Sequence, residues 1–68
     1  MNNKIKALRA ERKWSQADLA ERVSVSRQAI NAVETGKHDP SLMLAFDIAD
    51  SFEKTIEEVF VPPKKDQN

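Results

Sequence analysis

Residues 16–36 read QADLAERVSVSRQAINAVETG, and the fold of the chain depends on this stretch. Ser15, directly before it, is expected to cap a first helix, because Asp18 stands three residues later in the pattern of a capping box. Ser26 is expected to cap a second helix, and Gly36 to end it in the left-handed conformation that glycine adopts without strain. The stretch therefore predicts two helices joined by a very short link.

The link between these helices is about three residues long and runs from Val23 to Ser26. So short a connection makes two helix axes cross steeply, as in a helix-turn-helix. Ala20 is small enough to let the second helix approach closely, and Ile30 and Val33 face the core. The outer side of the second helix then carries no carboxylate before Glu34, and it consists of Arg27, Gln28, Asn31 and Ala32. This composition suits contact with phosphates and base edges.

Two further helices are predicted on either side of this pair. The first covers about residues 4–13 and follows Asn2 and Asn3, which can cap it. The other follows Asp39 as cap, with Pro40 at its first position. Its expected apolar face consists of Leu42, Ala45, Phe46, Ala49 and Phe52.

A last short helix follows Thr55, which pairs with Glu58 in a second capping box. It contains Ile56, Val59 and Phe60, and it ends before the Pro62–Pro63 pair. One glycine and three prolines are too few turn formers for an all-β domain. The sequence therefore predicts an all-α fold of five short helices.

Length and composition limit the functions that the chain can have. A chain of 68 residues makes one domain, expected here over residues 4–61 with the helix-turn-helix at 16–35 and a polar tail at 62–68. No cysteine and a single histidine exclude disulfides and thiolate metal sites, so we expect no metal and no cofactor. A small helical domain has little room for a deep cleft, which argues against an enzyme and against a small-molecule ligand. No apolar run is long enough to span a bilayer and no signal-peptide core is present, so a cytoplasmic protein without a membrane partner is expected.

The charges are unevenly distributed although the net charge is zero. Residues 1–37 carry eight basic and four acidic side chains, a net charge of +4, whereas residues 38–68 carry three basic and seven acidic ones, a net charge of −4. Such asymmetry can mark a surface that faces a polyanion, and it also arises by chance in small domains.

Residues 16–36, the segment Gly36–Leu42 and the closing residues 56–60 together resemble the Cro/repressor-type helix-turn-helix family, also called the xenobiotic-response-element (XRE) family. The similarity covers about residues 5–60. It implies a phage-repressor-like fold in which the second helix of the motif enters the DNA major groove and the first lies across the backbone. Two positions where the family often has glycine differ, because Ser24 occupies the turn and Glu53–Lys54 the corner before the last helix. A left-handed Ser24 would cost roughly 1 kcal/mol.

The resemblance also implies roles for single residues. Arg27 and Gln28 would lie nearest the groove floor, where they can pair with guanine and adenine, and Asn31 and Ala32 would be further base contacts. The expected phosphate contacts are Gln16, Ser26, Thr35 and Lys37. Arg9 and Glu34 would form a structural ion pair that holds the recognition helix against the first helix.

The end of the domain offers two apolar residues, Phe60 and Val61, for a dimer contact. One such domain makes few contacts for tight specific binding, so a homodimer is expected. The function predicted is that of a sequence-specific regulator that binds double-stranded DNA, a dimeric repressor with a palindromic operator. The alternative is an antitoxin-like module that neutralises a partner protein.

Overall fold

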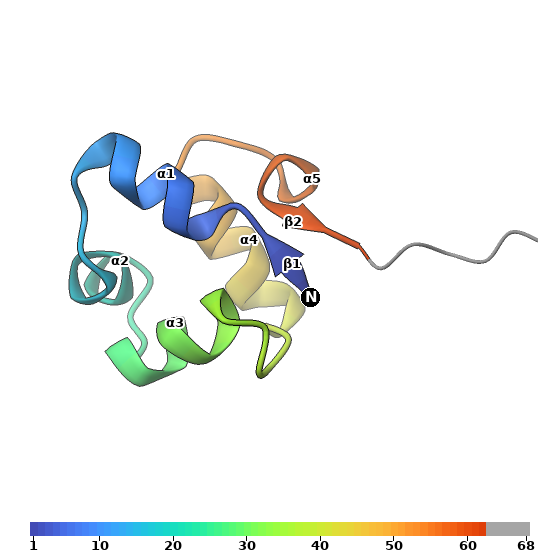
Figure 1. Ribbon diagram of the computed structural model, residues 1–68, viewed down its shortest axis with the longest axis horizontal. Helices are drawn as coiled ribbons and strands as arrows, with labels where there is room; N and C mark the ends of the chain where they lie inside the picture. Colours follow the sequence, from blue (N-terminus) through green and yellow to red (C-terminus); the bar gives the residue numbers. More distant parts are fainter. Residues whose placement is uncertain (63–68) are drawn as a thin grey trace, which may run out of the picture.

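Five α-helices follow one another in the computed structural model, which describes residues 1–62 (Figure 1). Their bounds are Ile5–Arg12 for α1, Gln16–Arg22 for α2, Arg27–Glu34 for α3, Leu42–Ser51 for α4 and Ile56–Val59 for α5. The expected all-α architecture of five short helices is confirmed. Residues 63–68, most of the polar tail expected from the sequence, lie outside the described part of the chain.

The starts of α2 and α5 depend on local hydrogen bonds that the sequence predicts. The backbone N–H of Asp18 donates to the Ser15 hydroxyl at 2.9 Å, and the N–H of Ser15 donates to the Asp18 carboxylate at 2.9 Å. Thr55 and Glu58 form the same reciprocal pair, at 2.8 and 3.2 Å. Both capping boxes are thereby confirmed, and each satisfies two backbone groups that a helix end leaves free.

Helix α4 begins later than the sequence predicts, and its buried face also differs from the predicted one. Ser41 is the cap, because its hydroxyl accepts the backbone N–H of Leu44 at 3.1 Å, whereas Asp39 lies 3.4 Å from the N-terminal amine. The buried side chains of the helix are Ala45, Ile48 and Ala49. Leu42 and Phe46, expected in the core, are exposed instead, so this part of the predicted helix face is wrong.

Two short strands join the ends of the domain, which the sequence did not predict. Strand β1 (Asn2–Asn3) pairs antiparallel with strand β2 (Phe60–Val61). The N–H of Lys4 extends the pairing to the Val59 carbonyl at 2.8 Å. The predicted continuation of the last helix through Phe60 is therefore wrong, because that residue is extended and pairs with Asn3.

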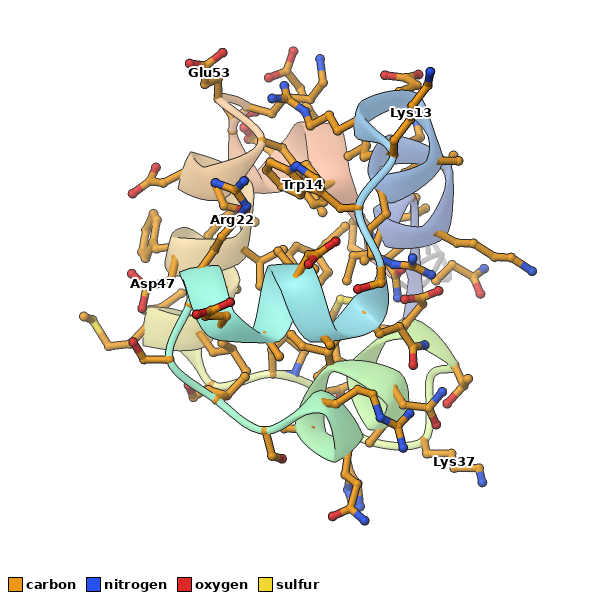
Figure 2. All side chains as sticks on the ribbon, turned by 90° about the vertical axis from the view of Figure 1, so that its left-hand side faces the viewer. Lys13, Trp14, Arg22, Lys37, Asp47 and Glu53 are labelled. Atoms are coloured by element: carbon orange, nitrogen blue, oxygen red, sulfur yellow. The ribbon has the colours of Figure 1, made fainter. Side chains whose placement is uncertain are left out.

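The core draws on all five helices and on β2. Its buried members are Ile5, Leu8, Leu19, Ala20, Val23, Ile30, Val33, Ala45, Ile48, Ala49, Phe52, Val59 and Phe60. Trp14 closes one side, with its ring stacked on Phe52 at a centroid distance of 5.3 Å. The guanidinium of Arg22 lies 4.0 Å from the centre of the Trp14 ring on that side of the molecule (Figure 2). A cation over an aromatic face is a favourable contact, so Arg22 covers the indole from solvent.

Within residues 1–62, three residues other than glycine have left-handed backbones: Lys13, Ser24 and Glu53, with φ of 60°, 60° and 59°. Each follows a helix, and Gly36, with φ of 80°, ends α3 in the same region. The left-handed conformation considered for Ser24 is therefore present. Side chains in this region cost roughly 1 kcal/mol each compared with glycine, so these three helix ends lower the stability of a small domain.

Candidate nucleic-acid interface

The turn between α2 and α3 is held by two backbone hydrogen bonds and by the side-chain cap of Ser26. The N–H of Ser24 donates to the Glu21 carbonyl at 3.3 Å, and that of Val25 donates to the Ala20 carbonyl at 3.0 Å. Ser26 then caps α3 by accepting the N–H of Ala29 at 3.0 Å. These contacts fix the direction in which α3 leaves the turn.

Helix α3 has one buried and one outer side. Ile30 is fully buried and Val33 is 4% exposed, and both belong to the core. The outer side carries the four residues that the sequence predicts as base contacts. Arg27 and Gln28 are exposed, and Asn31 and Ala32, one turn further on, are half-buried. Their spacing places all four on one face of the helix, which lies at the lower edge of the molecule in Figure 1.

The acid at the end of α3 is neutralised within the domain. Arg9 of α1 donates from Nε to Oε1 of Glu34 at 3.0 Å and from Nη2 to Oε2 at 2.7 Å. The two side chains are only 14% and 7% exposed. A third donor of Arg9, Nη1, reaches the Trp14 carbonyl at 2.8 Å. This bidentate pair keeps a carboxylate near the outer face of α3 from repelling an anionic ligand.

Gln16 lies between this ion pair and the outer face. Its Nε2 is 3.4 Å from Oε1 of Glu34, and its Oε1 accepts from Nη1 of Arg27 at 3.4 Å. Both contacts are at the long end of the hydrogen-bond range and are therefore weak. Gln16 and Arg27 can exchange them for a phosphate or a base at little cost.

Ser26 and Thr35, two further expected phosphate contacts, differ in whether their hydroxyl group has a hydrogen left to donate. Ser26 uses a lone pair for the cap, so its hydroxyl hydrogen remains available as a donor. The Thr35 hydroxyl donates its hydrogen to the Asn31 carbonyl at 2.8 Å, so it has no second hydrogen to give. Lys37 is exposed in the loop that follows α3 and extends from the lower part of the molecule (Figure 2).

Asn3, expected from the sequence only as a helix cap, also makes a contact with α3 that the sequence did not reveal. Its Nδ2 donates to the Val33 carbonyl at 3.0 Å and approaches that of Glu34 at 3.4 Å. The β1 strand is thus attached to the last turn of α3. No local pattern indicates such a contact, because the partners are 30 and 31 residues apart.

The two residues expected at a dimer contact have different surroundings. Phe60 is 4% exposed and packs in the core of its own chain, whereas Val61 is 42% exposed. Of these two residues, Val61 is therefore the one that offers an apolar side chain to a partner.

Neither a metal-holding cluster nor a membrane-spanning helix occurs among the described residues. Within residues 1–62, no three of the His, Asp and Glu side chains lie close enough to hold a metal ion. None of the helices in this range has the length and apolar character needed to cross a bilayer.

Comparison with known proteins reveals relatives over most of the chain. A helix-turn-helix family model matches residues 5–59. The chain is 52% identical over 61 residues to an uncharacterised HTH-type transcriptional regulator of Methanocaldococcus jannaschii, covering 90% of this chain and 92% of that protein. It is 47% identical over 60 residues to the uncharacterised HTH-type transcriptional regulator YgzD of Bacillus subtilis, covering 88% and 91%.

Two solved structures have a similar fold. The hypothetical transcription factor NHTF from Neisseria superimposes with a TM-score of 0.78 at 24% identity, covering 87% of this chain and 66% of that one. The clp gene regulator ClgR from Corynebacterium glutamicum superimposes with a TM-score of 0.73 at 20% identity, covering 79% and 57%. This chain therefore spans about two thirds or less of those two longer chains.

Proposed function

Because this chain belongs to the helix-turn-helix family of the XRE type, we propose that it regulates transcription by binding double-stranded DNA with α3 in the major groove. The observation that carries the proposal is the outer side of α3. Its polar residues lie on one face of a helix whose direction is fixed by the capped turn after α2. Binding, rather than catalysis, is the function that such a surface supports, and the protein would act in the cytoplasm on DNA.

Arg27 and Gln28 are the base-reading residues of this proposal, since both are exposed at the start of α3. Arginine can donate two hydrogen bonds to guanine O6 and N7, and glutamine can pair with adenine N6 and N7. Asn31 would form a hydrogen bond to a base through its side-chain amide. Ala32 would contact a thymine methyl group.

Gln16, Ser26 and Lys37 are proposed to bind phosphates around the reading face. Gln16 lies at the first turn of α2, where free backbone N–H groups also favour an anion. Lys37 adds a charge beyond the end of α3. The Arg9–Glu34 pair supports all of these contacts, because it holds α3 against α1 and neutralises the one acid on α3.

The proposed regulator is a dimeric repressor with a palindromic operator. One α3 helix covers only a few base pairs, and a two-fold pair doubles the sequence that is read. The two helices must then lie about 34 Å apart to enter successive major grooves on one side of the duplex.

Selection of bound duplexes from a random pool tests the proposal. We expect recovered sites with two inverted half-sites whose centres are roughly 10 base pairs apart. Recovery of unrelated sequences, with equal affinity for all of them, would contradict sequence-specific reading.

A further inference from the structure

The side chain of Asn3 connects two helices that are distant in the sequence. Its Oδ1 accepts the backbone N–H of Ile5, at the start of α1, at 3.1 Å. Its Nδ2 donates to the Val33 carbonyl at 3.0 Å and approaches the Glu34 carbonyl at 3.4 Å, at the end of α3. One amide therefore binds the first turn of α1 and the last turn of α3 together.

The last turn of α3 depends on donors from outside the helix. The final carbonyl groups of an α-helix have no intrahelical N–H partner. The backbone N–H groups of Gly36 and Lys37, in the loop that follows, donate to two carbonyls of α3 at 3.1 and 2.9 Å. Asn3 adds a donor from a different part of the chain, so it fixes this turn relative to α1.

Lys37 is the exposed residue whose place depends most directly on this turn. Its backbone N–H donates to the Ala32 carbonyl at 2.9 Å, so the end of α3 determines where the loop begins. The β1 strand leads into the same loop, because a Cβ added at Gly36 would lie 3.7 Å from the carbonyl oxygen of Met1. Figure 1 shows the N-terminal strand beside the end of α3. The segment that contains Asn3 therefore supports both the last turn of α3 and the loop that carries Lys37.

We propose that Asn3 is a positioning residue for DNA binding, which acts by placing Lys37 against a DNA phosphate. This inference rests on the proposed function, in which Lys37 binds a phosphate. The amide of Asn3 is half-buried and its hydrogen bonds lie within the domain, so Asn3 acts through Lys37 and not by touching DNA.

The Arg9–Glu34 ion pair does not replace this contact. Both of its partners are long side chains with several rotatable bonds, which can follow a small shift of the helix end. Asn3 instead binds the backbone of α3 through a short side chain, and a hydrogen bond weakens steeply when its distance or angle changes. Asn3 therefore restricts the position of the last turn more tightly than the ion pair does.

The test replaces Asn3 by Ser. A serine hydroxyl can still accept the N–H of Ile5, as serine does at helix starts, but it is too short to reach the carbonyls of α3. The replacement is neutral, so it adds no charge near the DNA. Asn2→Ser is the matched control, because Asn2 is the neighbouring asparagine of β1 and its side chain is exposed. Each replacement is also made in a Lys37→Ala background.

Titration with a random-sequence duplex at several salt concentrations measures the effect, at a temperature where circular dichroism shows every variant folded. Asn3→Ser should weaken binding at least about 3-fold, as expected for coupled residues. It should also reduce the slope of log K against log salt by about 1, as the loss of one phosphate contact does. In the Lys37→Ala background it should add neither effect, because the contact that it positions is already absent. Asn2→Ser should behave as its parent in both backgrounds.

An unchanged salt slope, or the same loss of affinity in both backgrounds, overturns the inference and leaves Asn3 as a residue of stability alone. If Asn3→Ser does not fold, the series is measured with Ser24→Gly, which removes a left-handed serine and so restores stability at a distance from the loop. A wild-type salt slope for Asn3→Ser in that background also overturns the inference.

The wild-type titration separates this inference from the proposed function. A wild-type protein that binds no duplex overturns the proposed function, and the role of Asn3 with it. A wild-type protein that binds duplex, together with an Asn3→Ser variant of the same affinity and salt slope, overturns the role of Asn3 and leaves DNA binding intact.

Discussion

Glu34, the last residue of α3, is bound by Arg9 of α1 through two hydrogen bonds of 3.0 and 2.7 Å. This is the salt bridge within residues 1–62 in which both partners are side chains, and it joins α3 to α1. Because both groups are largely shielded from water, the loss of one partner leaves a poorly solvated charge. The pair therefore connects the stability of the domain with the orientation of its proposed DNA-binding surface.

Replacing Glu34 by Ala should destabilise the protein rather than improve DNA binding. We expect a loss of about 3 kcal/mol in the free energy of unfolding, since Arg9 is left without its carboxylate. Glu21→Ala removes an exposed acid of α2 and should cost at most about 1 kcal/mol. Thermal and urea denaturation measure both, and equal melting temperatures for Glu34→Ala and wild type would show that the pair contributes nothing.

Replacing Ser24 by Gly should stabilise the protein by roughly 1 kcal/mol, because its φ of 60° is strained for serine and free for glycine. The control is Ala7→Gly at an exposed position within α1, which should destabilise by about 1 kcal/mol because glycine is a poorer helix former than alanine. Urea denaturation gives both changes. The prediction concerns their opposite signs, and destabilisation by Ser24→Gly would contradict it.

Arg27→Ala and Lys37→Ala should separate base reading from phosphate binding. Arg27→Ala should cost about 1–3 kcal/mol on the selected operator and relax one base position, with little change on random DNA. Lys37→Ala should weaken both DNAs similarly and reduce the slope of log K against log salt by about 1. Titrations at several salt concentrations measure these effects. Equal losses on both DNAs for Arg27→Ala would make it a phosphate contact instead.

Ser26→Ala and Thr35→Val should differ in their effect on DNA affinity. Ser26 has a free hydroxyl hydrogen, whereas Thr35 donates its own to the Asn31 carbonyl. Ser26→Ala should therefore weaken binding and also cost about 1 kcal/mol of stability through the lost cap, while Thr35→Val should leave DNA affinity nearly unchanged. A larger loss of affinity for Thr35→Val than for Ser26→Ala would show that the Thr35 hydroxyl turns toward a phosphate on binding.

The capping boxes predict how stability responds to acid. The backbone N–H of Thr55 lowers the pKa of Glu58 below its usual 4.5, and the N–H of Ser15 lowers that of Asp18 below 3.8. In the folded state both carboxylates bind a proton less readily than in the unfolded state, so their contribution is present above these usual values and is lost as the pH falls through the lowered ones. Glu58→Gln keeps a capping acceptor that does not titrate, and its melting temperature should fall less than that of wild type below about pH 4.5. Parallel acid dependence of the two proteins would contradict the prediction.

The sequence by itself determined the helix-turn-helix and most helix starts. The helix caps are hydrogen bonds between a side chain and a backbone N–H three residues away, made by Ser15 with Asp18, by Ser26, and by Thr55 with Glu58. The chain order alone brings these partners together. The same holds for the outer face of α3, since helical periodicity places Arg27, Gln28, Asn31 and Ala32 on one side once the helix is known.

Only the tertiary structure decided which apolar side chains of α4 are buried. The helix is apolar on more than one side, with Leu42, Phe46 and Ile48 all available, and the choice depends on which neighbours the helix meets. The strand pair depends likewise on contacts between Asn3 and Phe60, and the Asn3 bond to Val33 spans 30 residues. Such contacts arise from the packing of the whole chain, because no local hydrogen bond or periodicity favours one distant partner over another.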